Sequence, residues 1–175
     1  MPAGNYVESA WLRLDQTLTA VSGDAREVST FANGLDADYR TAPVTILVGS
    51  LATTDTFAGG SETLVNGVNL ATGRVVVAAT SNHINLTPQV GAGAPVRYGP
   101  RFKVSSWTGG KPLITWGGVT LLAGSDYNTQ VDATSSMLYV QLLFDVVSAN
   151  AGQGQRLAAA LDITPAPVAL LAGPS

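Results

Sequence analysis

The sequence contains no cysteine, and this absence excludes disulfide bonds and thiolate metal ligands. A chain of 175 residues is nevertheless long enough to bury a substantial core without such cross-links. We therefore expect one domain whose stability comes from apolar burial and hydrogen bonding.

Charged residues are scarce. Asp, Glu, Lys and Arg make up 12% of the sequence, where about 25% is usual in a soluble domain. Ser, Thr, Asn and Gln supply 45 of the 175 positions, so we expect a surface of hydroxyl and amide groups. Such a surface is easier to desolvate than a charged one. The composition favours a protein that neighbouring subunits cover; the alternative is a monomer whose mean hydropathy of +0.23 reflects its many alanines.

Basic clusters and long apolar runs are also missing. The net charge is −3, and the nine Lys and Arg residues are scattered singly, whereas binding to a nucleic-acid backbone requires a cluster of cations. No stretch reaches the roughly 18 apolar residues of a membrane span. The first 15 residues contain neither the basic nor the apolar region of a signal peptide. We expect no nucleic-acid partner, no membrane partner and no signal peptide.

The sequence has few residues or motifs that could form a metal site, a catalytic site or a nucleotide site. His83 is the only histidine, so a multi-histidine metal site within one chain is excluded, and only copies meeting on a symmetry axis would make it a ligand. Asp36 and Asp38 are spaced like the start of a calcium loop, but the glycine and the terminal glutamate of that loop are missing. Neither the nucleotide-binding glycine motifs nor the G-x-S-x-G elbow occurs.

We therefore expect no catalytic, cofactor or metal site and no enzymatic activity. An enzyme would require distant carboxylates to meet through the fold: Asp126, Asp132, Asp145 and Asp162.

Strand signals become clear at residue 44. Val44–Val48 is a β-branched run between a proline and a glycine, and it predicts a buried strand. Residues 53–61 are polar and predict a loop. Asn66 and Gly67 supply the two positive-φ residues of a type I′ turn. The valine-rich residues 74–79 predict the next strand of a meander.

The second half of the chain shows the same short strands. Residues 82–86 alternate polar and apolar side chains, and residues 88–100 predict a loop. Residues 102–122 hold three short strands separated by glycine pairs, which predict a second meander. Residues 137–147 alternate strictly and predict one central strand with one face fully buried. Residues 156–163 fit a final strand or a short alanine-rich helix, and their alternation favours the strand.

These patterns predict an all-β fold, an antiparallel β-sandwich or barrel of jelly-roll type. The expected organisation is an N-terminal arm and first strand over residues 1–40, a β-sandwich domain over residues 41–163, and an extended C-terminal tail over residues 164–175. Helix and strand remain alternatives within the first 40 residues. The tail contains three prolines, which we expect to prevent it from continuing a sheet.

The predicted interface residues lie in the arm and the tail. Trp11 and Leu12 suggest a docking segment in the arm, and Val168, Leu170 and Leu171 are apolar residues of the tail. We expect the tail to pack onto its own subunit or onto a neighbour. A disordered chain end is the alternative.

One aromatic concentration stands out. Trp107 and Trp116 flank a glycine pair, and Tyr98 lies nearby in the sequence. Exposed on a sandwich face, these rings would stack on sugars and form a glycan platform. Packing in the core or at a subunit interface is the more ordinary role of aromatic side chains.

Four features together carry a resemblance: the strand Val44–Val48, the turn at Asn66 and Gly67, the alternating residues 137–147, and the proline-containing tail, in a chain with very few charges. In its composition and strand pattern the chain resembles bacteriophage virion structural proteins, such as capsid decoration or cement proteins and small tail or fibre components. The resemblance is compositional and extends over the whole chain.

The resemblance implies a symmetric homo-oligomer such as a trimer, with other virion proteins such as the major capsid protein as partners. It implies a location in the virion after synthesis in the host cytoplasm, and no active site. The alternative function is host-surface recognition by a carbohydrate-binding tail or fibre module.

Overall fold

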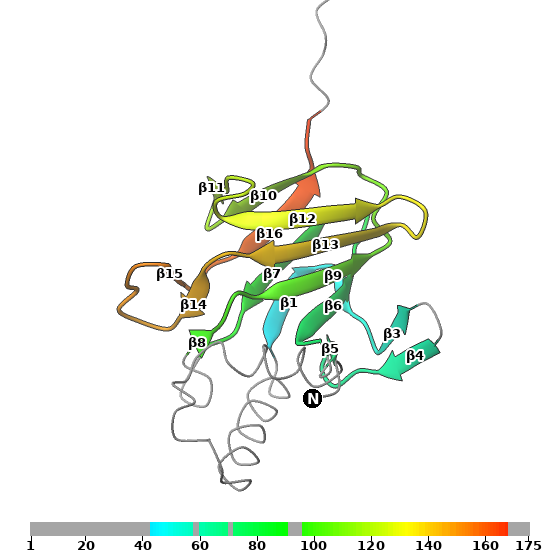
Figure 1. Ribbon diagram of the computed structural model, residues 1–175, viewed down its shortest axis with the longest axis horizontal. Helices are drawn as coiled ribbons and strands as arrows, with labels where there is room; N and C mark the ends of the chain where they lie inside the picture. The colour runs from blue at the N-terminus through cyan, green and yellow to red at the C-terminus, as the bar shows by residue number, and fades with distance from the viewer. Residues whose placement is uncertain (1–42, 58–59, 70–71, 91–95, 168–175) are drawn as a thin grey trace, which may run out of the picture.

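The computed structural model describes residues 43–57, 60–69, 72–90 and 96–167, and in these ranges all regular structure is β-strand (Figure 1). The predicted all-β class is therefore confirmed, and the strands form a sandwich of two main sheets. The predicted arm and first strand, residues 1–40, lie outside the described residues.

Sheet 1 has five strands, and all its neighbours are antiparallel. Their order across the sheet is β1 (Val44–Val48), β7 (Ile84–Pro88), β16 (Leu161–Pro165), β10 (Pro112–Trp116) and β11 (Val119–Thr120).

Sheet 2 has six strands, and it departs from the antiparallel expectation at one pair. Strands β6 and β9 run parallel. A parallel pair requires a crossover connection, and here the chain leaves sheet 2 after β6, forms β7 in sheet 1 and returns as β9. The order is β12 (Tyr127–Asp132), β13 (Met137–Leu142), β9 (Arg101–Ser105), β6 (Arg74–Ala78) and β2 (Ser50–Leu51), with β5 (Val68–Asn69) also on β6.

Two small sheets complete the described fold. One joins β15 (Gln155–Leu157), β14 (Asp145–Val147) and β8 (Val96–Arg97). The other is the hairpin of β3 (Thr54–Phe57) and β4 (Gly60–Thr63).

The core lies between sheets 1 and 2, which face each other in Figure 1. It forms because alternate side chains of a strand point to opposite faces, so that apolar residues two apart share one face. Both sheets supply buried side chains to it: Ile84, Leu86, Ile114, Leu161 and Ile163 from sheet 1, and Phe102, Val104, Leu138, Val140 and Leu142 from sheet 2.

A glycine forms the corner between the two sheets. Strand β1 belongs to sheet 1 and β2 to sheet 2, and Gly49 is the single residue between them. Its φ is 100°, and a Cβ at this position would lie 2.5 Å from Ile84 Cδ1 and 2.8 Å from the Ala78 carbonyl oxygen. The corner therefore requires glycine for both backbone conformation and space.

The turn predicted at Asn66 and Gly67 is confirmed. Their φ angles are 51° and 75°, as a type I′ turn requires. The backbone groups of Val65 and Val68 bond to each other across the turn, at 3.3 and 2.9 Å. The preceding strand β4, however, pairs with β3 and not across this turn.

Two predicted loops contain strands. Residues 53–61, predicted as a loop, form most of the β3–β4 hairpin, and residues 88–100 contain β8. Both segments are polar or glycine-rich and pair only locally or over a few residues. Their strand character depends on backbone pairing, which hydrophobic periodicity does not report.

Two predicted continuous strands are each divided between sheets. Residues 137–147 form β13 in sheet 2 and β14 in a small sheet, although the predicted inward face, which includes Phe144, is buried as expected. Residues 156–163 likewise form parts of β15 and β16. Alternation of apolar and polar residues shows which side chains are buried. It does not show where a strand ends, because the same alternation continues when the chain bends and joins another sheet.

The predicted meander over residues 102–122 is wrong in its first half. Strand β9 lies in sheet 2 and β10 in sheet 1, so only β10 and β11 form a hairpin. Strand β12 had no clear sequence signal. Strand β16 extends to Pro165, two residues into the predicted tail; proline is tolerated there because it is the last residue of the strand.

The corner at Gly49 can be tested against a glycine that has space around it. Gly118 also has a positive φ, 83°, but no atom lies within 4 Å of a Cβ built there. Gly118→Ala should lower the free energy of unfolding by about 1 kcal/mol through backbone strain alone. Gly49→Ala should lower it by about 3 kcal/mol, because strain and steric overlap act together. Urea unfolding measures both; equal losses would contradict this account of the corner.

Candidate functional site

The outward face of sheet 2 is polar because of the same alternation that builds the core. On β9, Phe102 and Val104 point inward, so Arg101 and Lys103 point outward. Tyr139 on β13 lies opposite Lys103 in the strand register. The face therefore carries an aromatic ring and cationic groups on neighbouring strands.

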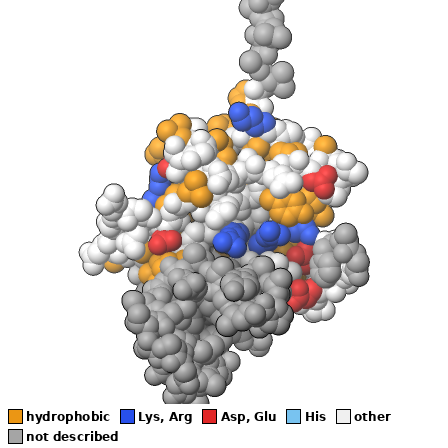
Figure 2. Space-filling view, in the orientation of Figure 1, with side chains coloured by type: hydrophobic (Ala, Val, Ile, Leu, Met, Phe, Trp, Pro, Cys, Tyr) orange, Lys and Arg blue, Asp and Glu red, His pale blue; other side chains and the backbone are white. Residues whose placement is uncertain are grey.

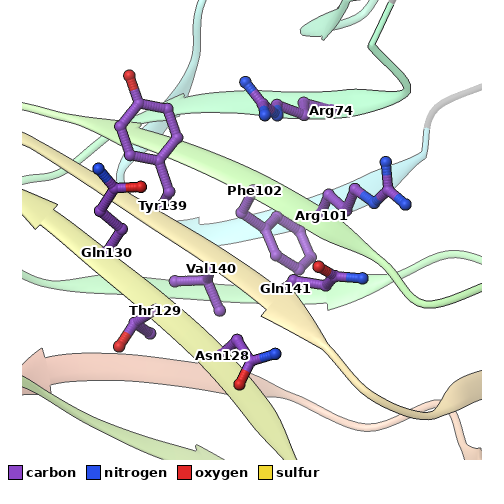
Figure 3. Close-up of a pocket in the computed structure, with 9 residues that line it drawn as sticks. All are labelled: Arg74, Arg101, Phe102, Asn128, Thr129, Gln130, Tyr139, Val140 and Gln141. Atoms are coloured by element: carbon purple, nitrogen blue, oxygen red, sulfur yellow. The ribbon is translucent and has the colours of Figure 1, made fainter. Parts of the chain in front are cut away.

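An open hollow of about 290 Å³ lies on this outward face (Figure 3). Strands β6, β9, β12 and β13 contribute to it. Its lining residues are Arg74, Arg101, Phe102, Asn128, Thr129, Gln130, Tyr139, Val140 and Gln141. We refer to it below as the sheet 2 hollow.

The charged residues that line the sheet 2 hollow are all positive. Two arginines line it and no acidic residue does, although the whole chain has a net charge of −3. The Arg74 guanidinium lies over the Tyr139 ring, 5.5 Å from its centroid. Neither Arg74 nor Arg101 forms an ion pair with any residue that the structure describes. Figure 2 shows basic side chains gathered on this face.

A third cation of the face is neutralised by the β3–β4 hairpin. Lys103 Nζ donates to Asp55 Oδ1 at 2.5 Å and to the Thr56 carbonyl oxygen at 2.6 Å. Asn69 Nδ2 donates to the other Asp55 oxygen at 2.9 Å. The Lys103 and Asp55 side chains are each only 6% exposed. This buried group ties the hairpin to sheet 2 and leaves the arginines as the unpaired cations of the hollow.

The proposed glycan platform is wrong for its two tryptophans. Trp107 is 0% and Trp116 6% exposed, so neither presents a ring face to a sugar. Each indole N–H donates to a carbonyl oxygen, that of Gly110 at 2.8 Å and that of Leu157 at 3.1 Å. Trp116 also packs edge-on against Phe144, with ring centroids 5.2 Å apart. Both tryptophans belong to the core because a large ring there buries apolar area and still satisfies its N–H group.

Tyr98, the third member of that predicted platform, is half-buried in the loop before β9. Because both tryptophans lie in the core, they form no exposed platform with Tyr98.

The structure does not bring the four considered carboxylates together. Asp126 pairs with Arg156 at 2.6 Å, and Asp145 accepts the Gly99 N–H. Asp162 lies 2.7 Å from His83 Nε2. No group of three or more potential metal ligands occurs in the described ranges.

Asp132 closes the turn between β12 and β13. It accepts hydrogen bonds from the Ser135 hydroxyl and N–H and from the Thr134 N–H. These bonds, with that of the Ser135 hydroxyl foremost, lower the pKa of Asp132.

A second surface lies where both sheets end. Residues 117–131 run from the turn before β11 to the fifth residue of β12, and we call them the β11–β12 edge; Asp132, the last residue of β12, follows them. All of these residues are exposed except Leu121, Asp126 and Tyr127. Their single charged residue is Asp126, which Arg156 neutralises. No described strand pairs with the outer side of β12.

Several predicted residues lie outside the described ranges: Trp11, Leu12, Asp36, Asp38, Val168, Leu170 and Leu171. In the part of the chain that is described, no helix has the length and apolarity needed to cross a membrane.

The sheet 2 hollow was not among the predicted sites. Its residues come from four strands that the sequence separates widely, and β12 was not recognised as a strand. The only signal was the outward position of Tyr139 and Gln141 in the alternating residues 137–147.

No protein-family model, curated protein or solved structure matches this chain.

The buried ion pair predicts an asymmetric response to mutation. Lys103→Met leaves the Asp55 carboxylate buried without its cation and should lower the free energy of unfolding by about 3–5 kcal/mol. Adding Asp55→Asn should restore part of this loss, because no unpaired charge remains. Lys111→Met, at an exposed position, should change stability by no more than about 0.5 kcal/mol. Chemical denaturation of the unmodified chain, these three variants and Asp55→Asn alone measures the coupling; losses for Lys103 and Asp55 that simply add would contradict it.

Proposed function

We propose that the chain is a structural subunit that assembles into a symmetric homo-oligomer through the β11–β12 edge. Following its compositional resemblance, we further propose that this oligomer stabilises a bacteriophage particle as a capsid decoration or cement protein. The β11–β12 edge is the observation that carries the first proposal.

The edge has the features of a contact surface. An exposed edge strand offers unpaired backbone groups to another strand, and monomeric proteins commonly protect such edges with charges, prolines or bulges. Strand β12 contains no proline and its only charged residue is its last, Asp132, and its pairing with β13 is regular over six residue pairs. The exposed apolar residues Val119, Leu122 and Val131 lie on the same edge.

A second copy of the chain is the partner that this composition fits. In a twofold contact the same strand of two subunits meets itself, and a charge near the twofold axis faces its own copy. Residues 127–131 carry no charge, so a contact centred on them brings no like charges together at the axis. Pairing β12 with its copy would continue sheet 2 from one subunit into the next.

The opposite edge of sheet 1 is less suited to regular pairing. Strand β1 is exposed there, with Leu47 80% exposed. Its pairing with β7 shifts register between Ile46 and Val48. Bulges of this kind bend an edge and obstruct the addition of a strand.

Assembly can be tested on the purified chain by size-exclusion chromatography with light scattering. The unmodified chain should be an oligomer. Val131→Lys and Leu122→Lys should each shift it toward the monomer, because a contact between copies would bring lysines close together. Leu47→Lys, at the β1 edge, is the matched control and should leave the mass unchanged. A monomeric unmodified chain, or loss of assembly only in Leu47→Lys, would refute assembly through the β11–β12 edge.

The tail residues Val168, Leu170 and Leu171 keep their predicted role as interface residues in this proposal. Removal of residues 168–175 should weaken attachment to phage particles while leaving the thermal stability of the chain nearly unchanged. Particle binding of the two forms can be compared by co-sedimentation. Equal attachment would contradict a role for the tail.

A further inference from the structure

We propose that the sheet 2 hollow binds a small anionic saccharide, a sugar unit that carries a carboxylate or a phosphate. This inference does not rest on the proposed assembly, because the two arginines that carry it lie on β6 and β9, although Asn128, Thr129 and Gln130 of the lining belong to the β11–β12 edge.

The strongest argument is the placement of two arginines on neighbouring strands without an acidic partner among the described residues. Arg74 and Arg101 are direct partners in the parallel register of β6 and β9, and neighbouring strands lie only about 4.8 Å apart. Like charges placed opposite each other on a sheet are destabilising. Two acidic side chains on this face are already engaged: Asp55 is bonded to Lys103, and Asp132, at the far end of β12, is bonded to Ser135 and Thr134. A bound anion would neutralise the two guanidinium groups.

Guanidinium groups also define the kind of anion. Their planar set of N–H donors matches a carboxylate or a phosphate with two parallel hydrogen bonds. The partial stacking of Arg74 on Tyr139, at 5.5 Å, restricts its position while leaving these donors available. Two such cations are too few to follow a nucleic-acid backbone, so a ligand with a single anionic group fits better.

The remaining lining indicates a partner with hydroxyl groups. The register places Arg74, Arg101, Gln141 and Asn128 in one row across four strands. Tyr139 and Gln130 are partners in the next row. Amide side chains and a phenol both donate and accept hydrogen bonds, as sugar hydroxyls do. Figure 3 shows these groups around the hollow, with the arginines on the β6 and β9 side.

The dimensions and the support of the hollow are consistent with one sugar unit. Its volume of about 290 Å³ is near the lower end, roughly 300 Å³, of small-molecule sites. All nine lining residues lie on strands and none on a loop. Groups on rigid strands keep their spacing, which favours recognition of a ligand with fixed geometry.

The experiment is a titration of the isotope-labelled full chain followed by NMR amide shifts. The probes are glucuronate, glucose 6-phosphate, neutral glucose and inorganic phosphate. Glucuronate or glucose 6-phosphate should shift amides around Arg101, Gln141 and Asn128, and comparing the two identifies the preferred anionic group. Glucose and inorganic phosphate should each bind at least about ten-fold more weakly, because glucose lacks the anionic group and phosphate lacks the sugar hydroxyls.

Variants locate the binding. Arg74→Gln and Arg101→Gln should each weaken binding of the better probe about ten-fold or more, since each removes a charged hydrogen-bond donor. Both arginines are half-buried on the surface, so the folded amide spectrum should remain. Lys111→Gln removes a charge elsewhere and should leave binding unchanged.

Three results would overturn the proposal. The first is the absence of shifts with both anionic sugars at millimolar concentration. The second is equal binding of glucose, or of inorganic phosphate, and the anionic sugars. The third is unchanged binding in the Arg74→Gln/Arg101→Gln double variant. Light scattering on the same samples reports the oligomeric state separately, so failure of this site is distinguishable from failure of the assembly proposal.

Discussion

The structure depends on the burial of one face of each sheet against the other. On β13 the fully or nearly fully buried Leu138, Val140 and Leu142 fix the strand in the sandwich. Because successive side chains point to opposite faces, their burial also forces Tyr139 and Gln141 outward. The outward face of sheet 2 is thus a geometric consequence of the core, and β6, β9 and β13, which hold most of the hollow, are packed on their other side.

The two candidate surfaces differ in their charge and are suited to different partners. The β11–β12 edge has one charged residue, already neutralised by Arg156, and exposes apolar and amide groups. Removing water from such a surface costs little free energy, as is required in contacts between proteins. The sheet 2 hollow instead holds Arg74 and Arg101 without a described acidic partner. A surface of that kind gains by binding an anion.

The buried polar groups that connect the elements of the fold are paired, whereas the buried Thr72 hydroxyl has no hydrogen-bond partner among the described residues. Lys103, Asp55 and Asn69 satisfy one another, and both core indole N–H groups reach carbonyl oxygens. Unpaired, these groups would each oppose folding. Their pairing also links distant segments, since residue 55 is joined to residue 103 and Trp116 to Leu157. The contacts between the hairpin, the sheets and the loops therefore rely on specific bonds as well as on apolar area.

The sequence by itself determined the all-β class, the inward face of residues 137–147 and the turn at Asn66 and Gly67, because each follows from local periodicity or local backbone preference. Only the tertiary structure decided which sheet each strand joins, where Gly49 turns the corner, and that the tryptophans are buried. It also brought Arg74, Arg101 and Tyr139 together. Pairing between strands far apart in the chain has no local signature, because it depends on the packing of all of them at once.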